Sequence, residues 1–161
     1  MNVSRVHLND PTFIQKLCNL VESYNIPKKY IELELTESMF LDNTEEALST
    51  MKKLRKLGFH VSIDDFGAGY SSLNLLKNMP TDVLKLDKEF FGHKKMKKEE
   101  EIIVTSIVEM AKRLNMKVLS EGIETEMQSE FLKKIGCDMA QGYFFFQPIS
   151  VDKFEKLLDN Q

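Results

Sequence analysis

Two adjacent aspartates, Asp64 and Asp65, follow a short β-branched segment and lead directly into a glycine-rich loop. The segment Val61–Ile63 has the composition of a buried strand. Two like charges at such a position have two explanations: a solvated strand end, or a cation held between the carboxylates. Neighbouring residues normally point to opposite faces of a strand, but a strand that bends into a glycine loop can turn both toward one side.

Polar groups also follow the other strand-like segments, and this set is the main functional signal in the sequence. Its members are Glu34 and Glu37, Lys85 and Asp87, Glu121 and Glu124, and Gln141. Taken singly, each has an ordinary structural explanation. Glu124 directly precedes a helix cap, Glu37 fits a solvated turn, and Lys85 alternates with leucines as a surface residue would. The case for a site rests on the whole set.

The elements that must position these groups alternate along the chain. Strand-like segments are Ile31–Thr36, Val61–Ile63, Val83–Leu86, Lys117–Leu119 and Met139–Phe145, with Asn2–Val6 as the end of another. Helical patterns lie between them; one begins with Asp10 as cap before a proline, and another runs from the capping box of Thr125 to Gly136. About six strand–helix units predict an α/β fold with a parallel sheet, in a single domain over residues 1–161.

In parallel α/β folds, ligands bind outside the carboxyl ends of the strands, so these polar groups are expected to converge. Several carboxylates in one place repel each other unless a cation is present. Two divalent metals ~4 Å apart would relieve the repulsion and suit phosphoester chemistry. Hard oxygen ligands favour Mg²⁺ or Mn²⁺.

The bulk composition excludes several classes of protein. A net charge of −3 over 161 residues provides no basic field for a nucleic-acid polymer. No apolar run reaches the ~18 residues of a membrane span, and the N-terminus lacks a signal-peptide pattern. Cys18 and Cys137 form no metal or redox motif, which favours a reduced, cytoplasmic location. "GAGYSS" lacks the third glycine of a dinucleotide-binding fingerprint.

The chain resembles the EAL domain of bacterial cyclic di-GMP phosphodiesterases. The matching blocks, in the family's order and covering nearly the whole chain, are "NVSR", "LELTES", "DDFGAGYSSL", "LKLDKEF", "SEGIET" and "QGYFFFQP". The resemblance implies a modified (β/α)8 barrel of the TIM type. It also implies a metal-dependent hydrolase that opens one phosphodiester of cyclic di-GMP to give linear pGpG.

The resemblance implies a role for each matching residue. Asn2, Glu34 and Asp64 match ligands of one metal, and Asp64 with Asp65 would hold a second. Glu121 matches the carboxylate that binds or activates the attacking water, and Lys85 the lysine that positions this water or the phosphate. Three further positions match supporting residues: Gln141 at the mouth of the barrel, Glu37 as the anchor of a loop, and Glu124 as another acid. The loop comprises Phe66, Gly67, Ala68, Gly69, Tyr70, Ser71 and Ser72.

The sequence departs from the family in one important respect: the family's own Glu-Ala-Leu motif, which precedes the position of Asn2 in the family, is absent. A smaller departure is Ala68, where the family often has threonine. A (β/α)8 barrel has typically ~250 residues, so the chain corresponds to the C-terminal two-thirds of the domain, strands three to eight, with one metal ligand missing. We expect unpaired sheet edges near Asn2–Val6 and Gln141–Phe145 and, through them, a homodimer or an opened barrel. The family also suggests a multidomain parent with sensor or diguanylate cyclase-like domains.

Three functions remain open from the sequence. The first is a cyclic di-GMP phosphodiesterase, impaired by the missing ligand. The second is a non-catalytic module that binds cyclic di-GMP or a protein partner. The third is an inert fragment of a larger signalling protein.

Overall fold

The structure, a computed structural model, describes residues 1–42, 44–67, 76–92 and 96–159. Six parallel strands form one sheet in the order of the sequence. They are β1 (Asn2–Val3), β2 (Glu32–Thr36), β3 (His60–Phe66), β4 (Val83–Leu86), β5 (Lys117–Ser120) and β6 (Met139–Ala140). The predicted α/β class and parallel sheet are confirmed.

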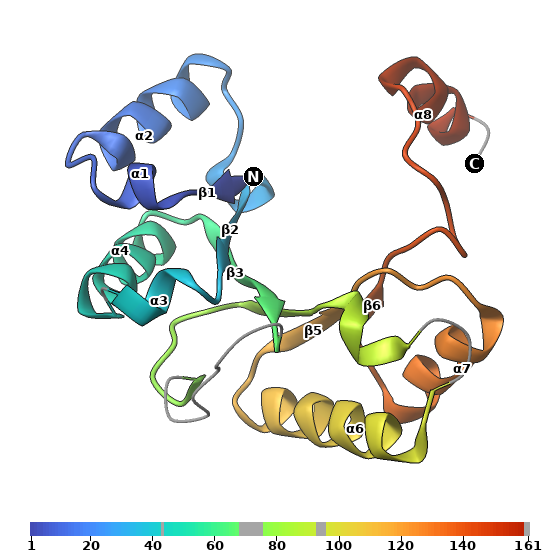
Figure 1. The fold of residues 1–161 in the computed structure, drawn as a ribbon. Helices are drawn as coiled ribbons and strands as arrows, with labels where there is room; N and C mark the ends of the chain where they lie inside the picture. Colours follow the sequence, from blue (N-terminus) through green and yellow to red (C-terminus); the bar gives the residue numbers. More distant parts are fainter. Residues whose placement is uncertain (43, 68–75, 93–95, 160–161) are drawn as a thin grey trace.

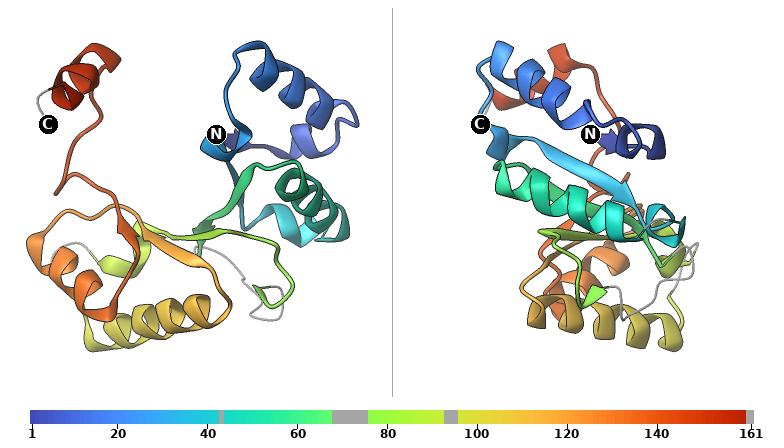
Figure 2. Two further views of the ribbon diagram at one scale, coloured as in Figure 1. Left: turned by 180° about the vertical axis from the view of Figure 1, so that it is seen from behind. Right: turned by 90° about the vertical axis from the view of Figure 1, so that its left-hand side faces the viewer.

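Helices connect the strands and cover one side of the curved sheet (Figures 1 and 2). The longer ones are α2 (Phe13–Ser23), α4 (Thr44–Lys56), α6 (Lys98–Arg113) and α7 (Glu126–Ile135). The shorter ones are α1 (Arg5–Leu8), η1 (Lys28–Tyr30), α3 (Met39–Asp42) and η2 (Lys88–Phe91). Helix α8 (Val151–Leu158) stands apart at the end of an extended segment, and none of its residues is buried. No described helix has both the length and the apolar composition that crossing a bilayer would require.

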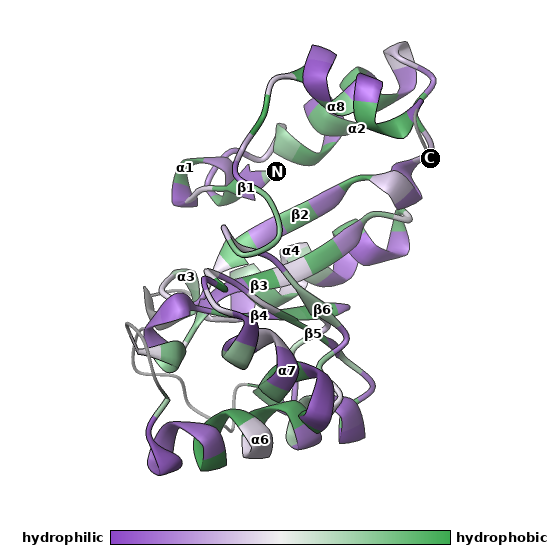
Figure 3. Cartoon of the chain, turned by 90° about the vertical axis from the view of Figure 1, so that its right-hand side faces the viewer, coloured by the Kyte–Doolittle hydropathy of each residue, from purple (hydrophilic) through white to green (hydrophobic). Residues whose placement is uncertain are grey.

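The two faces of the sheet differ because alternate strand residues point in opposite directions. The face toward the helices is apolar; Leu33, Leu35, Val61 and Ile63 are fully buried in a single core with residues of α2, α4 and α6. Burying each such side chain contributes ~1.5–3 kcal/mol. The other face carries Glu34, whose register partner is Ser62. This alternation is visible in β2 in Figure 3, where hydrophilic and hydrophobic bands succeed one another.

Two helix boundaries test the predictions from local sequence. The cap at Thr125 is confirmed, because its hydroxyl accepts the N–H of Gln128, and α7 ends at Gly136 in the left-handed conformation (φ 72°). The predicted cap at Asp10 was wrong, since α2 begins after Thr12. Asp10 instead accepts hydrogen bonds from the Thr12 hydroxyl and backbone N–H, and these bonds with that of Lys16 lower the pKa of Asp10 to about 2.

Two predicted strands were too long. Strand β1 stops at Val3 because Arg5–Leu8 turns into helix α1. The segment predicted as Met139–Phe145 is a strand only to Ala140. After it the chain turns: Phe144 N–H donates to Ile123 O (2.9 Å) and Phe146 N–H to Gly142 O (3.2 Å). Aromatic composition favoured a strand there, but these bonds to the preceding loop determine a turn.

The sheet is open in the described part of the chain. Strands β1 and β6 lie at its two edges, and each pairs with a single neighbour. Six parallel strands in sequential order, with the described helices between them on one side, are the arrangement of a partial (β/α)8 barrel. The polar face is therefore the face that would line the interior of such a barrel.

Candidate active site

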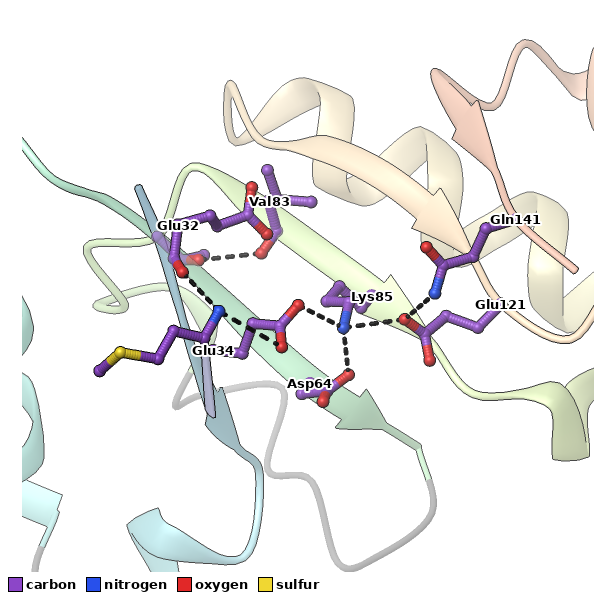
Figure 4. A network of polar contacts seen from close by, with 9 residues as sticks. Glu32, Glu34, Asp64, Val83, Lys85, Glu121 and Gln141 are labelled. Carbon is purple, nitrogen blue, oxygen red and sulfur yellow. Dashed lines mark hydrogen bonds and ion pairs between the residues drawn. The ribbon is translucent and has the colours of Figure 1, made fainter. Parts of the chain in front are cut away.

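The side chain of Lys85 is the centre of a polar network at the carboxyl ends of the strands (Figure 4). Its Nζ lies 2.9 Å from Glu34 Oε1, 2.8 Å from Asp64 Oδ1 and 2.8 Å from Glu121 Oε1. The three acids come from β2, β3 and the residue after β5, so groups far apart in sequence converge as expected. The ammonium group neutralises part of their mutual repulsion.

Sheet geometry explains how Lys85 reaches this position. Its neighbours Leu84 and Leu86 are fully buried, whereas Lys85 extends from the opposite face of β4. The lysine side chain is only 8% exposed. The alternative interpretation of Lys85 as a surface residue is therefore wrong, because the surrounding acids and not water solvate its charge.

Burial and charge act in opposite directions on the groups of this network. Burial by itself would lower the pKa of Lys85, but the contacts with Asp64, Glu121 and Glu34 outweigh it and raise that pKa above its ordinary value. Burial raises the pKa of Glu121, with the charges of Asp64 and Glu34 adding to the rise and Lys85 opposing it. Lys85 is thus held as a cation, while Glu121 accepts a proton more readily than an ordinary glutamate.

Gln141 completes this side of the network. Its amide Nε2 donates to Glu121 Oε1 at 2.8 Å, the same oxygen that contacts Lys85. The backbone fixes both residues, since Gln141 N–H donates to Ser120 O (2.8 Å) and Glu121 N–H to Leu86 O (3.0 Å). These bonds extend the sheet pairing past the strand ends and orient the Glu121 carboxylate.

A β-bulge explains the adjacent aspartates. Ile63 pairs with Leu84 and Phe66 with Leu86, so β3 contains one more residue than β4 over this interval. Asp65 takes the left-handed conformation (φ 53°) within the bulge. The predicted bend after Asp64 is therefore present, but it lies inside a strand that continues to Phe66 and not at the strand end.

Asp87 is one of the polar groups that the sequence predicted to converge, although it received no role of its own. Burial raises the pKa of Asp65, and the neighbouring charges of Asp64 and Asp87 raise it further. Asp87 directly follows β4 and caps η2, where its carboxylate accepts the N–H of Glu89 at 2.7 Å.

Glu37 lies beneath the Asp65 turn and is 5% exposed. Its Oε2 accepts the N–H of Gly67 at 2.8 Å, and its own N–H donates to Asp64 O at 3.1 Å. The alternative of a solvated turn residue is excluded by this burial. Phe66 is buried and Gly67 is exposed, whereas Ala68, Gly69, Tyr70, Ser71 and Ser72 lie outside the described residues.

Two other predicted residues are not part of the Lys85 network. Asn2 is exposed in β1, where it pairs in register with Glu34. Glu124 is exposed, and its backbone N–H donates to Gln128 Oε1. Glu124 does, however, line a cavity of about 950 Å³ together with Glu121 and Gln141.

The donor atoms suit a hard divalent cation. Asp64 Oδ1 is buried and lies 2.8 Å from Lys85 Nζ, and Ser62 Oγ on the same strand has no hydrogen-bond partner within the described residues. A buried carboxylate oxygen that already faces a cation, next to a second carboxylate, fits a cation ligand. Among the described residues, no group of three or more acidic, histidine or cysteine side chains is arranged to hold a metal ion. Glu34, Asp64 and Glu121 surround Lys85 Nζ instead.

Sequence comparisons match this chain to longer bacterial proteins. The signaling protein YkoW of Bacillus subtilis (strain 168) is 35% identical over 161 residues, covering 100% of this chain and 20% of that protein. The cyclic di-GMP phosphodiesterase PdeR of Escherichia coli (strain K12) is 36% identical over 156 residues, covering 97% of this chain and 24% of that protein. The chain thus spans a fifth to a quarter of the length of these curated relatives.

Solved structures share the fold. The EAL domain of Mycobacterium smegmatis DcpA superposes with a TM-score of 0.91 at 33% identity, covering 99% of this chain and 71% of that chain. The PaMucR phosphodiesterase in a c-di-GMP complex gives 0.88 at 33% identity, covering 95% and 62%. A manganese/cy-diGMP complex of Klebsiella pneumoniae BlrP1 gives 0.79 at 28% identity, covering 86% and 35%. The family model of the EAL domain matches residues 1–148, and the chain belongs to the EAL domain family.

Proposed function

We propose that this chain is the larger part of a phosphodiesterase domain that hydrolyses cyclic di-GMP to linear pGpG. The observation that carries the proposal is the buried Lys85 ammonium among three carboxylates at the carboxyl ends of the strands. Hydrolysis of a phosphodiester needs a positive group near the phosphate and a base near the attacking water, and the network contains both. The name of PdeR and the c-di-GMP complex of PaMucR support the substrate.

Each residue of the network has a proposed task. Lys85 binds a phosphate oxygen of the substrate and offsets the negative charge that develops there. Glu121 accepts the proton of the attacking water, a task suited to a carboxylate whose pKa is raised by burial. Gln141 orients Glu121, and Glu37 anchors the loop 66–72 through Gly67. Glu124 supports the wall of the adjoining cavity.

The proposed cofactor is Mg²⁺ or Mn²⁺, in two positions. Asn2, Glu34 and Asp64 would hold one ion, and Asp64 and Asp65 the other, with Asp87 beside Asp65. When bound, such ions neutralise phosphate charge and lower the pKa of water. The calcium and manganese complexes of BlrP1 show that EAL structures take divalent ions.

A second candidate is a module that binds cyclic di-GMP without hydrolysing it. It is favoured by the arrangement of the described acids, because Glu34, Asp64 and Glu121 surround Lys85 Nζ and not a position ready for a metal. The open edges at β1 and β6 support the further proposal that copies of the chain associate through them. Light scattering tests this association, and a monodisperse monomer would contradict it. The length of the relatives supports a multidomain parent.

The deciding experiment is hydrolysis of cyclic di-GMP by the purified chain with Mn²⁺ or Mg²⁺, followed as pGpG by chromatography. Asp64→Asn is the control. Turnover that the control abolishes supports the phosphodiesterase. Binding of cyclic di-GMP without turnover in either protein supports the second candidate.

A further inference from the structure

The turn that carries the adjacent aspartates is held from two sides. On one side the buried Glu37 accepts the Gly67 N–H and donates its own N–H to Asp64 O. On the other side lies the ring of Phe90. A Cβ atom added to Gly67 would overlap Cζ and Cε2 of this ring, so the ring rests directly on the Gly67 backbone. Only a glycine allows this contact.

A short element brings Phe90 to this turn. Asp87 caps helix η2 by accepting the Glu89 N–H with its carboxylate, and Phe90 N–H donates to Asp87 O at 3.2 Å. The ring of Phe90 covers Gly67. The next residue, Phe91, is 1% exposed and anchors η2 in the core. This anchored element therefore holds the Phe90 ring against the Gly67 backbone.

The backbone between these contacts adopts conformations that need outside support. Asp65 has φ 53° and Gly67 has φ 93°. A left-handed aspartate is less stable than an extended one, and such residues persist where their surroundings over-determine them. Glu37 supplies a hydrogen bond to this bulge, and the Phe90 ring supplies packing from the opposite side.

We propose that Phe90 is a positioning residue: with Glu37 it clamps the bulge Asp64–Gly67 and so holds the Asp65 carboxylate in the orientation that the site uses. The clamp itself is a property of the metal-free chain, whereas its catalytic consequence rests on the proposed function. Phe90 acts through Gly67 and Asp65, so the proposal gives it no contact with substrate. The matched control is Phe13, a buried aromatic residue of the same core that lies on α2 and not on η2.

The first test measures amide hydrogen exchange of Gly67 by NMR in the metal-free 161-residue chain. Phe90→Ala should accelerate exchange of this amide about tenfold, because its bond to Glu37 opens more often. The reference is the Val118 amide, which is bonded to Asp138 Oδ2 far along the sheet and should keep its rate. Phe13→Leu should leave the ratio of the two rates unchanged. If Phe90→Ala does not fold, Phe90→Leu gives the same comparison with a smaller acceleration.

The second test is a calorimetric titration with Mn²⁺ alone. Phe90→Ala should weaken Mn²⁺ binding about tenfold, since Asp65 is no longer held in place, while Phe13→Leu should bind as the unaltered chain does. An unchanged Gly67 exchange rate in folded Phe90→Ala, or faster exchange with unchanged Mn²⁺ affinity, overturns the proposal. If the unaltered chain binds no Mn²⁺ and hydrolyses no cyclic di-GMP, the proposed function fails, and the exchange measurement still decides whether Phe90 clamps the bulge.

Discussion

Acidic residues at the two ends of the sheet have different kinds of partner. At the amino ends, an aspartate directly before a strand accepts a backbone N–H of the preceding strand. Asp82, before β4, accepts from Val61 N–H at 3.0 Å, and its other oxygen pairs with Arg55 at 2.8 Å. Asp138, before β6, accepts from Val118 N–H at 2.9 Å. Each acid there has partners of its own.

At the carboxyl ends, three acids share one ammonium group. Glu34, Asp64 and Glu121 all contact Lys85, and the pKa of Glu121 is raised in spite of that contact. The three carboxylates repel each other in this arrangement, and a cluster with a purely structural role would avoid such repulsion. The amino ends are therefore built for stability, whereas the carboxyl ends keep charges that favour binding a further cation or a phosphate.

Removing the shared cation should produce the largest effect. We expect Lys85→Met to destabilise the chain by ~3 kcal/mol at pH 7, because it leaves three partly buried carboxylates without a counter-charge. The loss should shrink at pH 4, because burial raises the pKa of Glu121 and this carboxylate then gains a proton. Urea unfolding at the two pH values measures this, with the exposed Lys117→Met as the control within ~0.5 kcal/mol of the unaltered chain.

The difference between pH 4 and pH 7 comes from the carboxylates and not from titration of Lys85 itself. The pKa of Lys85 is raised above 10.5 in the folded chain, so its stabilisation is complete below 10.5 and is lost only as the pH rises through the folded value. A loss of equal size at pH 4 and pH 7 would mean that Lys85 stabilises through packing and not through its charge. Hydrolysis of cyclic di-GMP should be abolished in the same variant.

A substitution at the amino ends of the strands should destabilise the chain less and leave turnover unchanged. Asp82→Ala leaves the Val61 N–H unsatisfied and Arg55 unpaired, which we expect to cost ~1–3 kcal/mol. Asp82→Asn keeps an acceptor for Val61 and should lose less. Turnover per folded molecule should be unchanged in both, because Asp82 lies at the other end of β4. A fall in turnover that exceeds the unfolded fraction would contradict the division between the two ends.

The sequence predicted those parts of the molecule that depend on local rules. The cap at Thr125 and the stop at Gly136 are determined within a few residues, and the convergence of Glu34, Asp64, Lys85 and Glu121 follows from the geometry of any parallel sheet. Other features depend on contacts between distant segments. The bulge at Asp65 is set by pairing with β4, and the turn after Ala140 by bonds to Ile123. Residue types alone gave no signal for these contacts.

The smallest predicted effect concerns Asp65, and it is a gain. Burial, Asp64 and Asp87 raise its pKa above 3.8, so this group stabilises the fold below pH 3.8 and loses that stabilisation as the pH rises through the folded value. Asp65→Asn removes the repulsion and should therefore stabilise the metal-free chain at pH 7. We expect less than ~1 kcal/mol, because the carboxylate is partly solvated, which corresponds to at most ~2–4 °C in Tm for a chain of this size.

Thermal unfolding at pH 7 and at pH 3.5 distinguishes this charge effect from a change in packing. The gain should vanish at pH 3.5, where Asp65 itself is protonated. Asp138→Asn is the matched control at the amino end, where the carboxylate accepts a backbone hydrogen bond, and it should not raise the Tm at either pH. With Mn²⁺ present at pH 7, the unaltered chain should have a higher Tm than Asp65→Asn, because binding of Mn²⁺ stabilises the unaltered chain more. An acid whose removal stabilises the metal-free protein but destabilises the Mn²⁺-bound protein is kept for function. A rise in the Tm of Asp65→Asn that persisted at both pH values and with Mn²⁺ would assign Asp65 no such role.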